Sequence, residues 1–240
     1  MKFSESNIDL QCVIVAGGKG TRLRPLTNQI PKPMVTVLGV PFLEILISRL
    51  VAQGLWKFLV LTGYQATIIQ DYFGDGSKLN CSISYSNETI PLGSGGALWN
   101  AQKQLDDEFL YVNGDDYLEI KYKNLIRTFR DRRVNAMVVT YKNNQGQLDI
   151  DHQTNLVRLF DNSCLLPYLD CGTKIFRKSV LKKITPIYPF ALEPTLWPAL
   201  IKNQELASYT VQSQPYGIDS VEKLKKLEKI MKQIRTLQHD

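Results

Sequence analysis

The feature that most constrains this chain is a short apolar run near its start that breaks abruptly into glycines. Residues 12–15 (Cys-Val-Ile-Val) have the pattern of a buried strand, and Gly17, Gly18 and Gly20 follow them. Glycine lets the backbone turn tightly and approach a ligand closely. Because α/β sheets bind ligands at the carboxyl ends of their strands, the sequence predicts a binding loop at this strand end.

Cations and prolines follow the glycines. The cations are Lys19, Arg22, Arg24 and Lys32, and Pro25, Pro31 and Pro33 stiffen the segment between them. Bare backbone amides beside fixed positive charge favour a polyphosphate. Two familiar phosphate loops are excluded, because no G-x-x-x-x-G-K-[ST] string occurs and Leu23 stands where the dinucleotide fingerprint needs a third glycine. The plain alternative is a glycine turn with incidental surface lysines.

Strand and helix patterns alternate along the rest of the chain. We expect helices over residues 41–54, 67–73 and 122–133 and strands over residues 57–62, 81–85, 109–112, 135–142, 156–160 and 168–176. A polar stretch, residues 143–153, is expected to be a flexible excursion, and residues 206–228 have the pattern of strand, turn and amphipathic helix. The alternation predicts an α/β fold, a Rossmann-like three-layer α/β/α arrangement around a mostly parallel mixed sheet.

A second glycine-rich segment, residues 88–98 (ETIPLGSGGAL), leads into a helix that we expect to reach Gln104. Its glycines allow the backbone to press against something flat, and Ser94 can cap the helix that follows. Taken alone, the segment is as readily a purely structural turn.

A third segment, residues 108–118, carries Asn113, Gly114, Asp115 and Asp116 at the end of an apolar strand. These residues should reach the same sheet edge as the first loop. Strand-end carboxylates suit Mg²⁺, which takes few protein ligands together with substrate phosphates. The alternative is a turn that merely favours Asp and Gly.

These segments resemble the signature of the sugar-phosphate nucleotidyltransferases: Gly18-x-Gly20-Thr21-Arg22-Leu23, Pro25-Leu26-Thr27, Pro31-Lys32-Pro33-Met34 and Leu92-Gly93-Ser94-Gly95-Gly96-Ala97. The resemblance implies an enzyme that joins a nucleoside triphosphate to a sugar 1-phosphate and releases pyrophosphate. It also implies one domain, residues 1–240, with a nucleotide-binding half over about 10–120, a sugar-side lobe over about 121–240, and the compact build of stand-alone members.

The same resemblance assigns site residues. Those implied to bind nucleotide are Ala16, Gly17, Gly18, Gly20, Thr21, Arg22, Lys32, Glu88, Pro91, Gly93 and Ser94. Arg22, Lys32 and Asp115 would be catalytic, with Asp116 behind Asp115. Tyr168-Leu169-Asp170-Cys171-Gly172 resembles a sugar-binding strand, so Asn113, Asp170 and Gly172 are implied to bind the sugar phosphate. Asp115 and Asp219 would hold Mg²⁺.

The sequence departs from the family pattern at two places. Relatives often carry Glu-Lys-Pro where this chain has Asp161-Asn162-Ser163, so the lysine that holds the sugar's phosphate is missing. Either Lys174 or Arg158 substitutes, or the acceptor is held less tightly. The late turn Tyr216-Gly217-Ile218-Asp219-Ser220 exchanges the usual glycine and acid, so Asp219 is either the second metal ligand or only a cap of the final helix.

Composition narrows the remaining classes. The net charge of +6 is not gathered in one basic stripe, which argues against nucleic acid and suits anionic small-molecule substrates. His152 and His239 give little material for zinc or triad chemistry. Four cysteines without CxxC pairing are expected to be reduced and packed. Without a signal core or a long apolar run, we expect a cytoplasmic monomer or homodimer away from membranes.

Two other functions stay open. One is a non-catalytic subunit of the same fold that binds a nucleotide sugar and regulates a partner. The other is a dinucleotide-binding oxidoreductase, which would need an acidic residue where Leu61-Thr62-Gly63 ends the second strand. Neither the base nor the sugar follows from the sequence.

Overall fold

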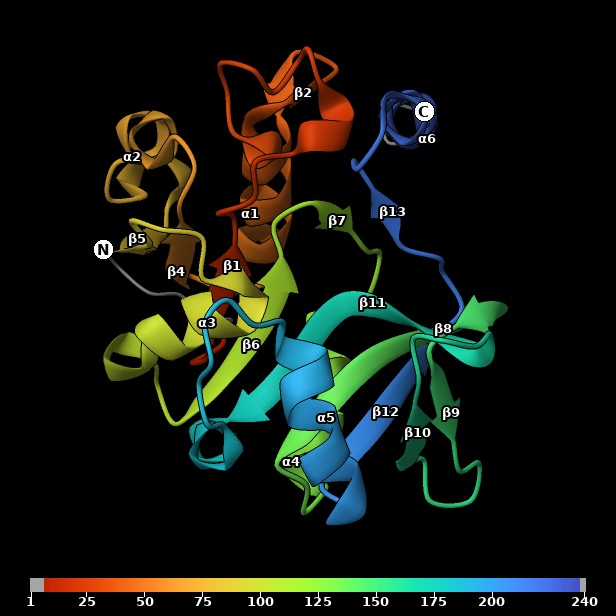
Figure 1. Cartoon of the computed structure of the whole chain (residues 1–240). Helices are drawn as coiled ribbons and strands as arrows, with labels where there is room; N and C mark the ends of the chain where they lie inside the picture. The colour runs from red at the N-terminus through yellow and green to blue at the C-terminus, as the bar shows by residue number, and fades with distance from the viewer. Residues whose placement is uncertain (1–6, 238–240) are drawn as a thin grey trace.

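The computed structural model describes residues 7–237 (Figure 1). Residues 1–6, which belong to the stretch where no signal core is expected, and His239 lie outside this range. The parallel part of the central sheet places β1 (Gln11–Val15) between β4 (Lys57–Thr62) and β6 (Glu108–Asn113), with β5 (Ser82–Asn87) beyond β4. The carboxyl ends of these strands therefore meet at one sheet edge.

The second half of the chain continues the same sheet. Strand β11 (Leu166–Arg177) runs antiparallel to both β6 and β8 (Ala136–Gly146), and β12 (Leu206–Val211) runs parallel to β8. Two short strands, β9 (Leu148–Ile150) and β10 (Val157–Phe160), complete it beside β11. The nine-stranded sheet is mixed, as the alternating pattern predicts.

Helices cover both faces of the sheet because successive strand residues point to opposite sides. Cys12 and Ile14 of β1 join one core cluster, and Val13 joins the other. The first cluster packs against α1 (Phe42–Ala52), α2 (Ala66–Phe73), α4 (Tyr122–Asp131) and α6 (Val221–Leu237), and the second packs against α3 (Gly93–Asn100) and α5 (Leu192–Lys202). Figure 1 shows α3 and α5 in front of the sheet. The three-layer prediction is confirmed.

Two short antiparallel ribbons lie outside the main sheet. One joins β2 (Thr36–Val37) to β3 (Val40–Pro41). The other joins β7 (Asp116–Tyr117) to β13 (Tyr216–Gly217), with Gly217 opposite Asp116. The Ile218 amide adds a 3.0 Å hydrogen bond to the Asp115 carbonyl. This ribbon brings the late turn, about 100 residues away along the chain, to the end of β6.

The structure corrects the expectation of a flexible excursion over residues 143–153 for its strand-forming part, up to Ile150, whereas residues 151–153 lie outside any strand. Strand β8 runs on to Gly146 and β9 follows, because these polar residues pair through their backbones with β11 while their side chains reach solvent. At Gly146 the strands pass so closely that an added Cβ would lie 1.8 Å from the Tyr168 carbonyl oxygen. A residue with a side chain would therefore separate β8 from β11.

The cysteine expectation holds in part. All four thiols are free, and Cys12, Cys81 and Cys171 are buried, whereas Cys164 is exposed. Cys164 sits in a turn between β10 and β11 instead of a core-facing strand, so the prediction that it is packed was wrong. In the described part of the chain, no helix has both the length and the apolar character needed to cross a membrane.

Candidate active site

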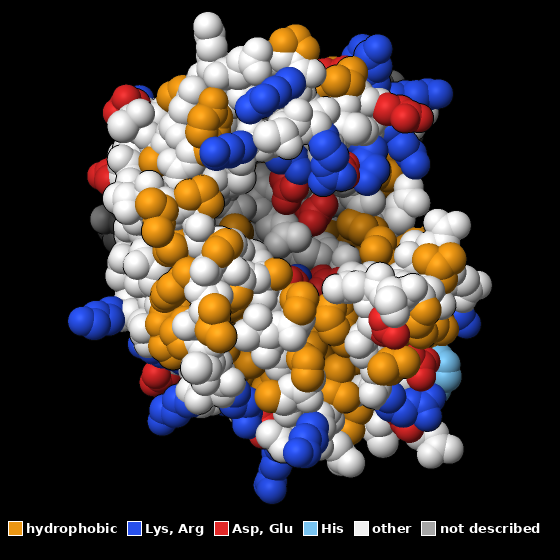
Figure 2. Space-filling model, in the orientation of Figure 1, with side chains coloured by type: hydrophobic (Ala, Val, Ile, Leu, Met, Phe, Trp, Pro, Cys, Tyr) orange, Lys and Arg blue, Asp and Glu red, His pale blue; other side chains and the backbone are white. Residues whose placement is uncertain are grey.

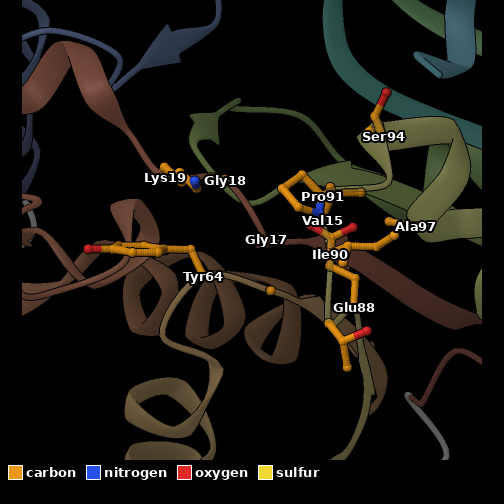
Figure 3. Close-up of a pocket in the computed structure, with 13 residues that line it drawn as sticks. Val15, Gly17, Gly18, Lys19, Tyr64, Glu88, Ile90, Pro91, Ser94 and Ala97 are labelled. Atoms are coloured by element: carbon orange, nitrogen blue, oxygen red, sulfur yellow. The ribbon is translucent and has the colours of Figure 1, made fainter. Parts of the chain in front are cut away.

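A cavity of about 710 Å³ opens at the carboxyl ends of β1, β4 and β5, and Figure 3 shows it. We call it the nucleotide pocket, after the residues that the sequence predicts to bind nucleotide. It is lined by Val15, Gly17, Gly18, Lys19, Gly63, Tyr64, Glu88, Thr89, Ile90, Pro91, Gly93, Ser94 and Ala97. Six of the residues assigned to the nucleotide are in that lining, from two segments that are about 70 residues apart in sequence. The fold therefore joins the first and second glycine-rich segments around one space.

Glu88 lies against the glycine loops at the base of this pocket. A Cβ added at Gly17 would stand 3.0 Å from Glu88 Oε1, and one added at Gly63 would stand 2.7 Å from it. The other carboxylate oxygen accepts a 3.0 Å hydrogen bond from the Leu92 amide. Partial burial raises the pKa of Glu88, although the Leu92 amide opposes that rise. Small residues at 17 and 63 thus leave room for a carboxylate fixed inside the pocket.

Gly20 does not line the nucleotide pocket. It leaves the space in which the Lys32 side chain packs. Its φ is +62°, and an added Cβ would lie 2.7 Å from Lys32 Cβ. The Thr27 hydroxyl fixes the same turn by donating a 2.7 Å hydrogen bond to the Gly20 carbonyl. Lys32 is consequently packed down and buried, and its Nζ donates to the Asp115 carboxylate. The first loop and the end of β6 are joined by this ion pair.

Ala16 and Thr21 are placed beside the nucleotide pocket but do not line it. Ala16 is buried and its amide donates a 2.8 Å hydrogen bond to the Leu61 carbonyl. Thr21 begins a short 3₁₀ turn, Thr21–Leu23, which carries Arg22 toward a second cavity.

The second cavity, of about 300 Å³, is the acidic pocket, lined by Arg22, Asn113, Asp115, Asp116, Leu169, Asp170, Pro215, Gly217, Asp219 and Lys223. Figure 2 shows a hollow in which acidic side chains lie next to a band of Lys and Arg. Arg22 Nη1 lies 3.0 Å from Asp219 Oδ2, and Lys223 Nζ lies 2.9 Å from Asp219 Oδ1. Arg22, Lys32 and Asp115 therefore share one neighbourhood, since Arg22 and Asp115 line this pocket and Lys32 contacts Asp115.

The acidic groups in this pocket differ in charge state. Burial, and then the charge of Asp115, raises the pKa of Asp116 to about 6. The Asn113 amide donates a 3.0 Å hydrogen bond to Asp116 Oδ2. Burial alone would raise the pKa of Asp219, but hydrogen bonding and charge from Lys223, with help from Lys32 and Arg22, bring it below its usual value. Asp219 is thus held ionised, whereas Asp116 titrates in the weakly acidic range.

The cap of α6 is Ser220 and not Asp219. The Ser220 hydroxyl accepts a 3.2 Å hydrogen bond from the Lys223 amide, while the Asp219 carboxylate faces the cations of the acidic pocket. The alternative in which Asp219 merely caps the final helix is therefore wrong.

The donor set of this pocket fits Mg²⁺. Among residues 7–237, no group of three or more His, Cys, Asp and Glu side chains is arranged to hold a metal. Asp115 and Asp219 nevertheless line one cavity, and their present partners are cations. Mg²⁺ takes one or two protein carboxylates and completes its shell with water and phosphate oxygens. Two carboxylates next to a phosphate-sized space satisfy that requirement.

A third cavity of about 260 Å³ adjoins the acidic pocket through Asn113 and Asp170, which line both. We call it the sugar-side pocket. Lys174 there is 1 % exposed, with its Nζ 3.0 Å from Asp170 Oδ2 and 2.9 Å from Glu193 Oε1. Burial would lower the pKa of Lys174, but the two carboxylates raise it above the ordinary value. The ammonium group of Lys174 is therefore held in ion pairs with Asp170 and Glu193.

Of the two cations considered as substitutes for the missing lysine, neither is free. Arg158 points to Asp149 and Asp151, each 3.7 Å away on the β9–β10 side, and it lines none of the three pockets. Lys174 is enclosed between two carboxylates. A phosphate in the acidic pocket would face other cations.

Gly172 makes the close approach that its position predicts, but to protein atoms. Its φ is +73°, and an added Cβ would lie 2.4 Å from Asp116 Oδ2 and 2.8 Å from Asn113 Nδ2. Any side chain at 172 would displace the end of β6. The residue also lines the sugar-side pocket.

The second glycine-rich segment is packed differently from the sequence expectation. A Cβ at Gly93 would lie 2.4 Å from the Phe190 carbonyl oxygen, and one at Gly95 would lie 2.4 Å from the Phe190 ring. The glycines thus admit the segment that precedes α5, while Pro91 and Ala97 face the pocket. Ser94 does not cap its own helix, because its hydroxyl accepts a 3.0 Å hydrogen bond from the Leu192 amide of α5.

Several lining residues have no role predicted from the sequence. Gly63 and Tyr64 follow β4, and their signal is their place at a strand end next to β1. Glu193 carries no such signal, because the sequence pattern predicts no helix over α5. Lys223 has only the pattern of the solvated face of the last helix.

Comparisons with known proteins find relatives of this chain. The family model described as nucleotidyl transferase matches residues 11–148. A mannose-1-phosphate guanylyltransferase of Mycobacterium tuberculosis is 30 % identical over 217 residues, which cover 88 % of this chain and 60 % of that protein. A D-glycero-alpha-D-manno-heptose 1-phosphate guanylyltransferase of Campylobacter jejuni is 37 % identical over 116 residues, which are 48 % of this chain and 52 % of that one.

A solved structure has the same fold over nearly its full length. HddC from Yersinia pseudotuberculosis, described as complexed with GMP-PN, superposes with a TM-score of 0.77 at 28 % identity, covering 92 % of this chain and 99 % of that one. The chain spans about half to three fifths of the length of the two curated relatives above. The match over more than half of its residues, on a fold that unites the three predicted segments, shows that this chain belongs to the nucleotidyl transferase family.

Proposed function

We propose that the protein transfers a nucleotidyl group from a nucleoside triphosphate to a sugar 1-phosphate, releasing pyrophosphate and forming a nucleotide sugar. The observation that carries the proposal is the ion pair between Lys32 and Asp115, which joins the glycine loop to the acidic pocket. Asp115 lines the acidic pocket, and Lys32 packs against Gly20 of the loop whose Gly17 and Gly18 line the nucleotide pocket. Two phosphorylated substrates placed in these cavities would meet beside Lys32.

The reaction needs positioning and charge neutralisation more than proton transfer. The attacking oxygen belongs to a phosphate monoester that is already ionised near neutral pH, so no general base is required. Lys32, whose geometry is fixed by Gly20, would stabilise charge at the α-phosphate during in-line displacement. Arg22, with a side chain 75 % exposed at the pocket mouth, would bind the departing pyrophosphate through its planar guanidinium.

Asp115 and Asp219 would hold Mg²⁺, which when bound supplies positive charge to phosphate oxygens. Both carboxylates are paired with lysine or arginine in this structure, so each is already neutralised by a cation. Asp116, with its raised pKa and its hydrogen bond from Asn113, would support Asp115 from behind.

Guanosine is the base that we propose first. The two curated relatives described above are named guanylyltransferases, and the solved relative is described with GMP-PN. A relative from Synechocystis sp. named as a UTP–glucose-1-phosphate uridylyltransferase makes UTP the second choice. Mannose and heptose 1-phosphates follow as the first acceptors to test.

The experiment is a pyrophosphate-release screen with Mg²⁺. Four nucleoside triphosphates are combined with mannose, heptose, glucose and amino-sugar 1-phosphates. We expect at least one pair to turn over, and Lys32→Gln and Asp115→Asn each to reduce turnover by about 10²-fold or more. Lys57→Gln is the matched control, because Lys57 and Asp106 form a 2.6 Å ion pair at the opposite edge of the sheet.

Unchanged turnover in Lys32→Gln and Asp115→Asn would refute the assignment of the site. If no pair of substrates releases pyrophosphate and calorimetry shows tight binding of a nucleotide sugar, the result would instead favour the non-catalytic subunit.

A further inference from the structure

We propose that Lys223 binds the phosphate of the acceptor substrate, an inference that rests on the proposed function. Lys223 and Arg22 are the two cationic side chains that line the acidic pocket. They come from opposite parts of the chain, since Arg22 follows β1 and Lys223 lies in the first turn of α6. Arg22 can therefore bind the triphosphate while Lys223 binds the phosphate of the acceptor.

Lys223 has one carboxylate partner, which it shares with Arg22. Asp219 lies 3.0 Å from Arg22 and 2.9 Å from Lys223. One carboxylate neutralises at most one of these two cations, although Asp115, Asp116 and Asp170 also line the pocket. The Lys223 side chain is 58 % exposed, and its ammonium can therefore turn to a second anion without leaving a buried partner. Such an exposed ammonium can donate a charge-assisted hydrogen bond to a phosphate oxygen.

The other cations near the acceptor are excluded by their contacts. Lys174 is 1 % exposed and enclosed by Asp170 and Glu193. Arg158 faces Asp149 and Asp151 and lines none of the three pockets. A phosphate held by Lys223 would also leave its sugar close to Asn113 and Asp170, the two residues shared with the sugar-side pocket.

The sugar-side pocket, which adjoins the acidic pocket, has polar groups that can bind the sugar of the acceptor. The sugar-side pocket presents the carboxylates of Asp170 and Glu193, which accept hydrogen bonds from hydroxyl or amino groups. Their single buried cation, Lys174, leaves the three charged groups with one negative charge in excess. Neutral and amino sugars suit this pocket, whereas a sugar bearing a carboxylate would be repelled. The acceptor class is thus a neutral or amino aldose 1-phosphate.

The test compares Lys223→Gln with Lys223→Arg and with Lys226→Gln. Lys226 is the matched control, because it lies one turn along α6 and lines only a neighbouring cavity. Calorimetry with mannose 1-phosphate and Mg²⁺ measures acceptor binding without turnover, and initial rates give KM for each substrate. We expect Lys223→Gln to weaken acceptor binding and raise acceptor KM by about 10- to 100-fold. The KM of the triphosphate should change by less than about threefold, and Lys223→Arg should restore most of the loss.

Equal acceptor affinity in wild type and Lys223→Gln would overturn the inference, as would an equal rise in both KM values. Absence of any acceptor binding by the wild-type protein would also overturn it. If the wild type binds mannose 1-phosphate through Lys223 but releases no pyrophosphate with any nucleotide, the inference stands and the proposed function fails. A glucuronic acid 1-phosphate that binds as tightly as glucose 1-phosphate would overturn the acceptor class alone.

Discussion

The hydroxyl of Ser94 in α3 accepts a 3.0 Å hydrogen bond from the backbone amide of Leu192, the first residue of α5. The first amides of a helix have no partner within the helix, and a side-chain oxygen that binds one of them stabilises the helix. A residue of the nucleotide pocket therefore begins the helix that carries Glu193 into the sugar-side pocket.

We predict that Ser94→Ala lowers the free energy of unfolding by about 1 kcal/mol, because the Leu192 amide loses its acceptor. Urea denaturation of the wild type and the variant measures this. Ser82→Ala, at an exposed position of β5, is the control and should change stability by less than about 0.5 kcal/mol. Full stability of Ser94→Ala together with weaker nucleotide binding would mean that the hydroxyl serves the ligand instead.

Gly93→Ala should destabilise the protein by more than about 2 kcal/mol. The residue has a φ of +78°, and the new Cβ would lie 2.4 Å from the Phe190 carbonyl oxygen. The cost of backbone strain and the cost of this steric overlap therefore both lower the free energy of unfolding. Gly39→Ala separates these terms, because Gly39 has a φ of +82° but open space around an added Cβ. A loss no larger than that of Gly39→Ala would show that the segment before α5 yields easily. Thermal unfolding of both variants decides the matter.

Lys174→Met should cost about 3–5 kcal/mol of unfolding free energy, since it leaves the buried Asp170 and the half-buried Glu193 without their cation. In the wild type, Lys174 outweighs burial and lowers the pKa of Glu193, so that contribution is present above its unfolded pKa and lost as pH falls through the folded pKa.

In the Lys174→Met variant the contribution of Glu193 to the pH dependence should reverse, whereas that of Asp170, whose pKa burial already raises in the wild type, should grow. Without the lysine, burial raises both carboxyl pKa values above those of the unfolded chain, so stability falls as pH rises above about 4. Denaturation curves measured between pH 4 and 8 test the sign. The triple variant with Asp170→Asn and Glu193→Gln should recover much of the loss, and a pH-independent Lys174→Met would contradict this account.

Ser220→Ala and Asp219→Ala should have opposite consequences. Removing the Ser220 hydroxyl takes away the acceptor of the Lys223 amide and should lower stability by about 1 kcal/mol, with little change in the Mg²⁺ concentration that gives half-maximal turnover. Asp219→Ala should leave stability nearly unchanged and raise that Mg²⁺ requirement at least about tenfold. Titrating Mg²⁺ into both variants, alongside denaturation curves, measures the two effects. Identical Mg²⁺ curves for wild type and Asp219→Ala would remove Asp219 from the proposed metal site.

Whatever depends on a strand and the loop directly after it follows well from the sequence. Lys32 and Asp115 are predicted to lie together, because parallel strands bring their carboxyl ends to one edge and each residue follows such a strand. The same reasoning locates Glu88 and the nucleotide pocket. The roles assigned to these residues in binding and catalysis stay predictions.

What could not be predicted depends on contacts between distant segments. The burial of Lys174 between Asp170 and Glu193 needs α5, whose helical pattern is masked by Pro194 in its first turn and Pro198 in its interior. The Ser94 hydrogen bond spans 98 residues and leaves no local signal, so the sequence pattern assigns the residue to its own helix instead. Polar residues in β8 and β9 resemble a loop because their backbone partners on β11 are not visible in the sequence.

Strand β11 pairs along one part of its length with β6 and over most of its length with β8. A clamshell motion of one half of the chain against the other would have to break those backbone hydrogen bonds together, at a free-energy cost far above that of moving a surface loop. In the proposed reaction, shielding of the phosphates from bulk water would then come from local rearrangement of the chain around Arg22 and Lys223. Rate-limiting closure, where it exists, should respond to substitutions in those two peripheral segments while the sheet stays rigid.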